Sequence, residues 1–430
     1  MPRAKSESYI LVAMSAVLSL CAVLMTGCTG PEAGSGAAVT VFEGARLIVG
    51  DGSVPIEDAV FIVEGDRFTH AGRRADVQIP GDASRVDLSG KTVMPAIVNT
   101  HMHLASTRED RVDQLQHMAY YGAGLVMSLG LDSGDVPFQI RDEAVPDGAR
   151  ARTAGRGITA PEPGRSEVPF WITSEEEAQT AVQELAARQV DLVKIWVDTR
   201  NGQYEKLSPA LYGAVIDEAH RHDLRVTAHV FTLEDAKGLL RAGIDAFAHG
   251  VRDRDVDAEL VALWSERPNV VLVPNLPNPG VAVDLGWLSG TVPDDELQEM
   301  QEASRDRPAA QESFGIQARN LARLNRAGVR IAFGTDGSTP WAPHQEMEDM
   351  VRSGMTPAEV IVAATRSSAE LMQMTDIGTV TVGKSADFIV LDANPLDEIT
   401  NTRRIAAVYL RGIAVDRDAL GAHFRGRTSQ

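Results

Sequence analysis

The sequence predicts an α/β protein, a (β/α)8 TIM-like barrel with a small β-sandwich domain formed by both its N- and C-terminal flanks. Three observations predict this fold. In the centre of the chain, short β-rich runs alternate with amphipathic helical stretches, the pattern of parallel βα units. Both flanks consist of short β-rich runs separated by glycine and aspartate. No G-x-G-x-x-G motif follows the first central strand, which disfavours the alternative of a doubly wound open sheet.

The first residues of the chain predict an export signal. Arg3 and Lys5 precede an uncharged stretch over residues 9–25, and a basic start followed by an apolar run is typical of signal peptides. The run ends in Leu24-Met25-Thr26-Gly27-Cys28, which resembles the lipobox of bacterial lipoproteins. The alternative is an uncleaved membrane anchor in which Cys28 is incidental.

The lipobox predicts a signal peptide over residues 1–27 and a lipid attached to Cys28 of the mature chain. Residues 28–38 would form a flexible tether, because they are mostly small and polar. We therefore expect an exported protein that is lipid-anchored to a bacterial membrane, at the cell surface or on the periplasmic face. The only other cysteine, Cys21, lies in the predicted signal, so no disulfide is expected.

The overall charge limits the partners that the chain can have. Its 430 residues carry a formal net charge of −19 at pH 7. Nucleic acids and anionic membranes both require a basic protein face, so neither is expected as a direct partner. Membrane contact would occur through the lipid anchor only, and the expected partner is a small-molecule substrate. The composition is also compatible with a homo-oligomer.

The β-sandwich domain is predicted over residues 39–93 plus 379–415. Its expected strands cover 39–42, 46–49, 59–63, 386–391 and 405–410, with Gly383 and Gly412 as turn points.

The barrel is predicted over residues 94–378, about the size of a typical (β/α)8 barrel. Eight expected strands cover residues 97–102, 125–129, 152–154, 191–197, 225–229, 246–249, 270–273 and 330–334. Helix starts lie between them: Thr173 with Glu176 and Thr356 with Glu359 fit capping boxes, and Pro209 and Pro357 fit first helical positions.

Polar residues that suit metal binding end several of these strands. His101 and His103 close the first strand, and the two-residue period of a strand directs both imidazoles to the same side. His229, His249 and Asp336 end three other strands. In a barrel of this kind the carboxyl ends of the strands meet at one face, so these five side chains are expected to converge there.

Lys194 lies in an apolar strand where an unpaired ammonium would be unfavourable. One interpretation is a lysine paired with an acid at the barrel rim. The other, which we favour, is a carbamate formed from Lys194 and carbon dioxide, because an anion with two oxygens can bridge two metal ions.

Substrate contacts are predicted in the loops after the strands. Arg156, after the third strand, could hold a substrate carboxylate, and its alternative is a structural salt bridge. Trp341 and His344 lie in the last such loop as candidates for the pocket wall, and loop packing is the alternative for His344. The long segment 274–304 is a candidate lid.

Several motifs together resemble the metal-dependent amidohydrolase superfamily, in particular its imidazolonepropionase- and prolidase-like members. The segment from Met94 to His103 is similar to the first-strand motif of this family. The closing segment of the family is similar to Gly354-Met355-Thr356-Pro357, Ala363-Ala364-Thr365 and Gly383-Lys384-Ser385-Ala386-Asp387. The resemblance covers residues 39–415. Ala96 and Asn99 depart from the pattern, which usually has Gly and often Asp at these positions.

This resemblance implies a centre of two divalent metal ions. His101 and His103 would bind the more buried ion with Asp336, and His229 and His249 would bind the other, with carboxylated Lys194 bridging both. Zinc is the default ion for such ligands, although manganese, cobalt and iron also suit them. With Asn99 in place of the frequent Asp, this chain would lack a negative charge next to the metal ligands.

The implied activity is hydrolysis of an amide-type C–N bond by a metal-bridging hydroxide, with Asp336 as the group that transfers the proton. A dipeptide, an N-acyl amino acid and a cyclic amide all fit as substrates. Hydrolysis of an ester, lactone or phosphotriester on the same binuclear site is one alternative. A non-catalytic, tethered binding lipoprotein is another.

Overall fold

The computed structural model describes residues 39–426. The predicted signal peptide, the tether and Cys28 lie outside the described residues. Among the described residues, no helix combines the length and the apolar character needed to cross a membrane.

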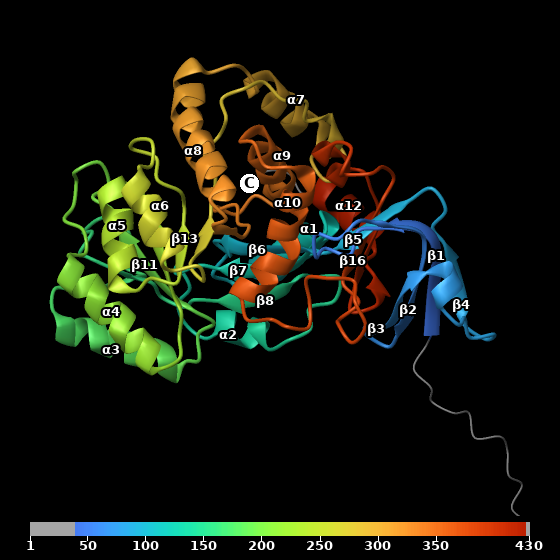
Figure 1. The fold of residues 1–430 in the computed structure, drawn as a ribbon, viewed down its shortest axis with the longest axis horizontal. Coiled ribbons are helices and arrows are strands. Elements are labelled where there is room, and N and C mark those ends of the chain that lie inside the picture. Colours follow the sequence, from blue (N-terminus) through green and yellow to red (C-terminus); the bar gives the residue numbers. More distant parts are fainter. Residues whose placement is uncertain (1–38, 427–430) are drawn as a thin grey trace, which may run out of the picture. The chain divides into compact units, whose positions relative to one another are not determined.

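Strands from both flanks of the chain form a single sheet (Figure 1). Its order is β18-β17-β16-β5-β1-β2-β3, and β4 pairs with β1. The strands are β1 (Val39–Leu47), β2 (Ile56–Glu64), β3 (Arg67–Arg73), β4 (Ser84–Asp87), β5 (Thr92–Pro95), β16 (Phe388–Leu391), β17 (Ile405–Leu410) and β18 (Ile413–Ala414). Because β5 pairs with β1 on one side and with β16 on the other, the two flanks belong to one β-rich region, as predicted.

A core of aromatic rings stabilises this sheet. Phe42 stacks on Phe61 with ring centroids 4.9 Å apart, and Phe388 meets both rings edge-on. Phe42, Phe61 and Phe388 are at most 1% exposed, so these rings contribute a large share of the apolar area buried in this part of the molecule.

The central part of the chain contains two parallel sheets. One consists of β6 (Ile97–Met102), β7 (Ala123–Ser128) and β8 (Arg150–Thr153). The other has the order β10-β9-β11-β12-β13-β14-β15, with β9 (Ile158–Thr159), β10 (Phe170–Trp171), β11 (Val193–Val197), β12 (Val226–Val230), β13 (Ala246–Ala248), β14 (Val271–Val273) and β15 (Arg330–Ile331). All eight strands predicted for this region are present, and the short β9 and β10 are additional.

Main-chain hydrogen bonds also join the edges of these two parallel sheets. The Thr100 N–H donates to the Phe333 carbonyl at 2.9 Å, next to β6 and β15. The Asp191 N–H donates to the Thr153 carbonyl at 3.0 Å, between β8 and the residues that lead into β11. The region is therefore an α/β fold with parallel sheets whose edges approach each other twice.

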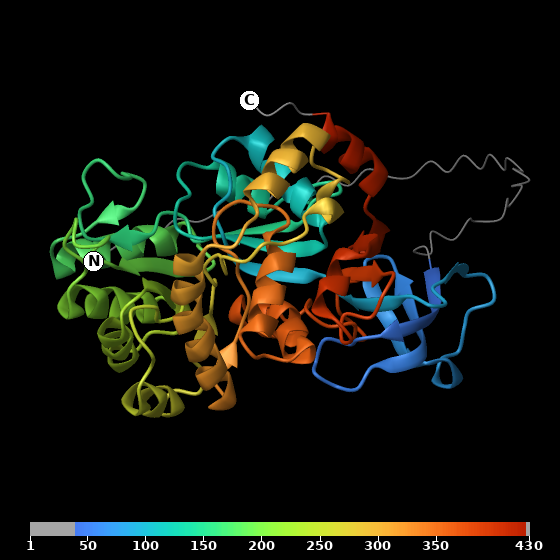
Figure 2. The ribbon, with the colours of Figure 1, turned by 90° about the horizontal axis from the view of Figure 1, so that it is seen from above.

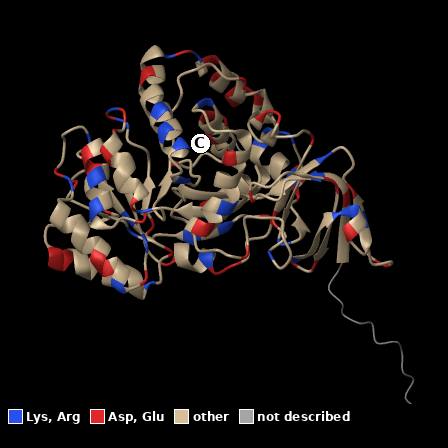
Figure 3. Ribbon diagram, viewed as in Figure 1, with Lys and Arg blue, Asp and Glu red and all other residues tan. Residues whose placement is uncertain are grey.

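Helices separate the parallel strands along the chain. They are α1 (Arg108–Tyr120), α2 (Val136–Arg141), α3 (Glu175–Ala187), α4 (Pro209–Arg221), α5 (Leu233–Ala242), α6 (Ala258–Ser265), α7 (Asp294–Ala303), α8 (Pro308–Arg326), α9 (Ala342–Arg352), α10 (Pro357–Val362), α11 (Ser368–Leu371) and α12 (Arg417–Arg425). Successive helices from α3 to α6 pack side by side next to β11 and β13 (Figure 1). Acidic and basic residues both occur on the outer helices of this region (Figure 3).

The helix starts agree with the sequence predictions, except that the N-cap of α3 lies one residue later than predicted. Thr356 and Glu359 form a capping box, and Pro209 and Pro357 occupy first turns as predicted. The box predicted for Thr173 and Glu176 is wrong by one residue, because Ser174 is the N-cap of α3. The Ser174 hydroxyl accepts from the Glu177 N–H at 3.2 Å, while the Glu177 carboxylate turns back to Thr173.

Candidate metal and active site

The histidines and the aspartate predicted at the strand ends line one cavity of about 290 Å³. They are His101, His103, His229, His249 and Asp336. His101 and His103 lie at the end of β6, and His229 lies in β12. His249 directly follows β13, and Asp336 lies in the loop after β15. Parallel strands place their carboxyl ends at the same edge, which is why residues far apart in sequence meet here.

Asp336 is the centre of this cluster. Its Oδ1 lies 3.0 Å from His103 Nε2 and 3.6 Å from His101 Nε2, and its Oδ2 lies 3.6 Å from His249 Nε2. One ligand atom each from His101, His249 and Asp336 lies within 4.8 Å of the other two, a spacing that could hold a metal ion. The side chains of His103 and Asp336 are 25% and 40% exposed, so the cluster is open on one side.

Unusual backbone conformations hold this cluster in place. His249, Asn275 and Asp336 have φ angles of 105°, 43° and 58°, in the left-handed region that residues other than glycine rarely adopt. Each such conformation costs about 1–3 kcal/mol and tends to persist at functional sites. At Gly334 the chain passes so close to His101 that a Cβ atom on this glycine would lie 2.8 Å from the histidine Cβ.

Burial determines the protonation of the cluster. Burial and the charge of Lys194 lower the pKa of His101 well below its usual value. Burial also lowers the pKa of His249, so both rings are neutral and able to act as metal ligands. Burial alone would raise the pKa of Asp336, but the neighbouring imidazoles of His101 and His103 lower it further than burial raises it, and the side chain is a carboxylate.

Lys194 in β11 is fully buried and has no acidic partner. Its Nζ has no hydrogen-bond partner, and among residues 39–426 no carboxylate lies within ion-pair distance of it. The contact observed is with the ring of Trp196, whose centroid lies 5.4 Å from Nζ. Burial lowers the pKa of this amine to about 7. The alternative of a lysine paired with an acid at the barrel rim is therefore not what the described residues show.

A glycine makes room for Lys194. Gly130 has a φ of 92°, and a Cβ atom at this position would lie 2.8 Å from the lysine Cγ and 2.7 Å from the Trp196 ring. Any other residue at position 130 would displace the lysine stem that reaches the cluster.

An ion-pair network that the sequence analysis missed borders His229. The His229 Nε2 lies 3.3 Å from Asp198 Oδ2 and 3.2 Å from Arg200 Nη1. Arg200 also donates to Asp198 at 3.0 Å and to Glu162 at 2.9 Å. Asp198 directly follows β11, so the strand-end rule could have found it, whereas Arg200 and Glu162 lie in irregular loops without a periodic signal.

Two asparagines form hydrogen bonds with His101. Asn275, two residues after β14, places Oδ1 3.1 Å from His101 Nδ1, and its own Nδ2 has no hydrogen-bond partner. Asn99 accepts from the His101 N–H at 3.2 Å and donates to Thr335 Oγ1 at 2.9 Å. Asn99 therefore links two segments that carry ligands, and Asn275 is a further contact that the sequence analysis missed.

The three predicted substrate contacts lie elsewhere. Arg156 donates to the carbonyls of Val168 and Pro169 and stacks 3.8 Å over the ring of Phe170, so its guanidinium is occupied by the chain itself. His344 is buried between the Thr402 hydroxyl and the Tyr121 carbonyl, both at 3.0 Å, which corresponds to the alternative of loop packing.

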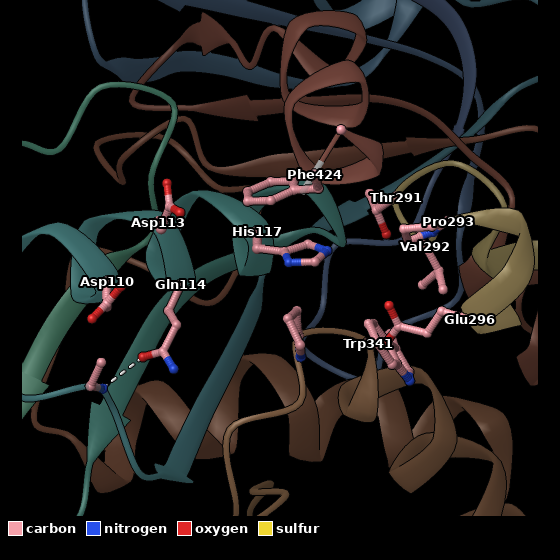
Figure 4. A pocket seen from close by; sticks show the side chains of 13 residues that line it. Asp110, Asp113, Gln114, His117, Thr291, Val292, Pro293, Glu296, Trp341 and Phe424 are labelled. Carbon is pink, nitrogen blue, oxygen red and sulfur yellow. Dashed lines mark hydrogen bonds between the residues drawn. The ribbon is translucent and has the colours of Figure 1, made fainter. Parts of the chain in front are cut away.

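Trp341 lines a different and larger cavity, of about 740 Å³ (Figure 4). Its wall also contains His117, which stacks on Phe424 of α12 at 3.8 Å, and Pro293 from the segment 274–304. Figure 2 shows α12 beside α1 and α7, the helices that enclose this space. None of the six predicted metal ligands lines it. The smaller cavity is the candidate active site because the four imidazoles and the carboxylate line it, and Lys194 lies near enough to His101 and His249 for its charge to affect their pKa values.

Comparison with known proteins shows the family to which this chain belongs. Residues 168–415 match the amidohydrolase family. An uncharacterised protein of Mycobacterium tuberculosis is 31% identical over 353 residues, which are 74% of this chain and 83% of the relative. The imidazolonepropionase of Streptomyces coelicolor is 25% identical over 383 residues, 83% of this chain and 92% of that enzyme.

A solved structure gives the same result. The crystal structure of a candidate prolidase from Bifidobacterium longum is similar with a TM-score of 0.73 and 26% identity, over 90% of this chain and 99% of the other. The chain belongs to the amidohydrolase family and is a hydrolase that acts on carbon–nitrogen bonds.

Proposed function

We propose that this protein is a metal-dependent hydrolase that cleaves an amide-type C–N bond in a dipeptide, an N-acyl amino acid or a cyclic amide. The observation that supports it is the convergence of four histidines and Asp336 on one cavity, with the unpartnered amine of Lys194 buried beside them. A cavity of about 290 Å³ suits a small substrate.

The donor set fits divalent metal ions. Both ring nitrogens of His249 and the Nζ of Lys194 are buried without hydrogen-bond partners, and a ligand atom left in this state is stabilised when it coordinates an ion. We propose that His101, His103 and Asp336 hold one ion, that His229 and His249 hold the other, and that both are zinc. When bound, two such ions would lower the pKa of a water molecule and polarise the substrate carbonyl.

Lys194 would complete this centre as a carbamate. A pKa of about 7 leaves a large fraction of the amine neutral at physiological pH. The neutral Nζ would attack the carbon of carbon dioxide, forming an N–C bond and releasing one proton, so that the side chain becomes an anion with two oxygens. This change would turn an uncompensated buried cation into a ligand for both ions.

Asp336 is placed to move the proton during the reaction. Its side chain is ionised and 40% exposed at the open side of the cluster, so a carboxylate oxygen can accept a proton from the attacking water and pass it to the leaving nitrogen. The hydrogen bond from His103 and the main-chain bond from the Asp336 N–H to the His101 carbonyl at 2.8 Å fix its position.

The wider architecture is part of this proposal. The hydrogen bonds that join the two parallel sheets support one closed (β/α)8 barrel over residues 94–378, and the shared sheet of the flanks supports a β-sandwich domain from 39–93 with 379–415. We propose that the enzyme acts on small molecules while a lipid on Cys28 tethers it to a bacterial membrane.

The test combines metal analysis with an assay. Purified protein should contain about two divalent ions per chain and should hydrolyse members of a panel of dipeptides, N-acyl amino acids and cyclic amides. Esters, lactones and phosphotriesters in the same assay would reveal the alternative chemistry. Metal-loaded protein that hydrolyses none of these compounds would contradict the proposal and favour a tethered binding protein.

Asp336→Asn tests the proton transfer. Compared at full metal loading, the variant should lose about 10²- to 10⁴-fold in kcat. Asp142→Asn is the matched control, because Asp142 is 70% exposed at the surface and should leave kcat unchanged. Full activity of metal-loaded Asp336→Asn would assign the proton transfer to another group.

A further inference from the structure

Arg252 lies in the loop that follows β13, shortly after His249. Its N–H donates to the Phe231 carbonyl at 2.9 Å, which ties this loop to the end of β12. Its guanidinium stacks on the Phe231 ring, with Cζ 3.4 Å from the ring centroid. The other contacts of that ring are with His229 and His249, at centroid distances of 4.2 and 5.3 Å. The cation is therefore held beside two of the proposed metal ligands.

The charge of Arg252 has no counterion among the described residues. Its Nε is buried without a hydrogen-bond partner, and no carboxylate in the part of the chain that the structure describes lies within ion-pair distance. Burial lowers its pKa to about 10, while Asp336 and Asp198 favour the charged form from further away. The group is thus a cation at neutral pH. A partly buried guanidinium without an acceptor is unfavourable unless a ligand supplies one.

The other arginines near the cavity are already paired. Arg200 binds Asp198 and Glu162, and Arg165 binds Glu162 at 3.2 Å. Arg156, which the sequence offered as a carboxylate contact with a structural role as the alternative, donates to main-chain carbonyls. Among these arginines, Arg252 is the one whose guanidinium makes no hydrogen bond or ion pair with the described residues.

We propose that Arg252 binds the free carboxylate of the substrate and selects N-acyl amino acids and dipeptides over uncharged amides. This inference rests on the amide hydrolysis proposed above. In these substrates the carboxylate is two bonds from the scissile nitrogen, so an anchor beside His229 and His249 brings the C–N bond to the strand-end cluster. A guanidinium pairs with a carboxylate through two parallel N–H bonds, which orients the substrate as well as binding it.

The kinetic test compares carboxylates with carboxamides. Metal-loaded enzyme is assayed on N-acetyl amino acids and dipeptides, and on the same compounds with a C-terminal carboxamide. Arg252→Met should raise KM and lower kcat/KM at least about 30-fold for the carboxylates and leave the carboxamides nearly unchanged. Arg252→Lys, which keeps the charge but not the planar fork, should give a smaller loss and covers the case in which the methionine variant does not fold.

Arg254→Met is the matched control, because Arg254 lies in the same loop, is 64% exposed and pairs with Asp253. It should retain the preference of the wild type for carboxylates. Equal losses on both classes of compound in Arg252→Met, or no loss on either, would overturn the proposed role.

A binding experiment separates this inference from the proposed function. N-acetyl-L-alanine and its carboxamide are titrated calorimetrically into metal-loaded wild type, Arg252→Met and Arg254→Met. Binding of the carboxylate that is lost only in Arg252→Met supports the anchor, even if the wild type hydrolyses no amide and the hydrolytic proposal fails. No binding to any of the three proteins, or equal binding to all, overturns the anchor.

Discussion

Two buried lysines of this protein lie in opposite environments. Lys237 on α5 is 4% exposed, and its Nζ lies 2.6 Å from Asp257 and 2.8 Å from Glu259, with Glu234 at 3.5 Å. Lys194 in β11 is fully buried, and its Nζ has no such partner among residues 39–426. The first lysine is surrounded by carboxylates on the outer helices, and the second faces neutral imidazoles at the strand ends.

The difference shows what each lysine does. Hydrogen bonds and charge from Asp257 and Glu259 raise the pKa of Lys237, so it remains a cation that joins α5 to α6. Uncompensated burial lowers the pKa of Lys194 to about 7. A buried ionisable group without a counterion destabilises the fold, and such groups gather where function requires them. Burial by itself is therefore less informative than the partners of the buried atom.

The largest effect is expected for Lys194→Met. If the lysine bridges both ions as a carbamate, the variant should bind fewer than two ions per chain and lose at least about 10³-fold in kcat. Lys237→Met should retain the metal content and kcat of the wild type. The measurements are metal analysis, kcat, and a carbamate signal in a ¹³C spectrum after exposure to labelled carbon dioxide. A Lys194→Met protein with two ions and full activity would remove the distinction between the two lysines.

A smaller effect is expected for Asn275→Ala. Loss of the contact to His101 Nδ1 leaves this ring free to turn, so the metal affinity should fall about 10- to 100-fold. Competition with a chelator measures it. Asn325→Ala, on the outer surface of α8, is the control and should leave the affinity unchanged. An unchanged affinity in Asn275→Ala would mean that Asn99 alone orients the ring.

Stability should change in opposite directions in the two lysine variants when metal is absent. Lys237→Met leaves Glu234 and Asp257 without this cation and Glu259 with Arg241 alone, so the variant should melt at a lower temperature than the wild type. Lys194→Met replaces an uncompensated buried amine with an apolar side chain of similar length, so the metal-free variant should be at least as stable as the metal-free wild type. Calorimetric melting of both variants checks this. A clear loss of stability in Lys194→Met would show that the amine has a structural role.

The smallest expected effect is a pH dependence of the stability that Lys237 contributes to the fold. The folded protein lowers the pKa values of Asp257 and Glu259 below 3.8 and 4.5, chiefly through Lys237. Groups with depressed pKa values stabilise the fold above their unfolded values and lose this contribution as the pH falls through the folded ones. The melting difference between wild type and Lys237→Met should thus be present at pH 7 and shrink below about pH 4. A melting difference that persists at lower pH would show that Lys237 stabilises the fold through packing rather than through its ion pairs.

The convergence of the strand-end residues was easier to predict from the sequence than the contacts around them. His101, His103, His229, His249 and Asp336 each end a predicted strand, and parallel strands bring such ends together whatever the details of packing. Asn275 and Asp198 follow the same rule but were missed, because short polar residues after a strand are also common in turns.

The choice among arginines shows where prediction from sequence ends. Arg156 and Arg252 both follow predicted strands, and nothing local distinguishes them. The tertiary structure turns Arg156 toward the carbonyl of Val168 and leaves Arg252 on the ring of Phe231 without an acceptor. The shift of the α3 cap from Thr173 to Ser174 has a similar cause, since both residues suit an N-cap and the path of the chain selects one.

By itself, the sequence determined the alternation of strands and helices, the β-rich flanks and the residue types at the strand ends. These features depend on the period of the backbone and on short-range patterns that every segment carries within itself. The tertiary structure decided which polar atoms found partners: Lys237 did, and Lys194 and Arg252 did not. Partners are brought together by segments distant in the chain, and the energy of a buried charge depends on those neighbours rather than on the residue itself.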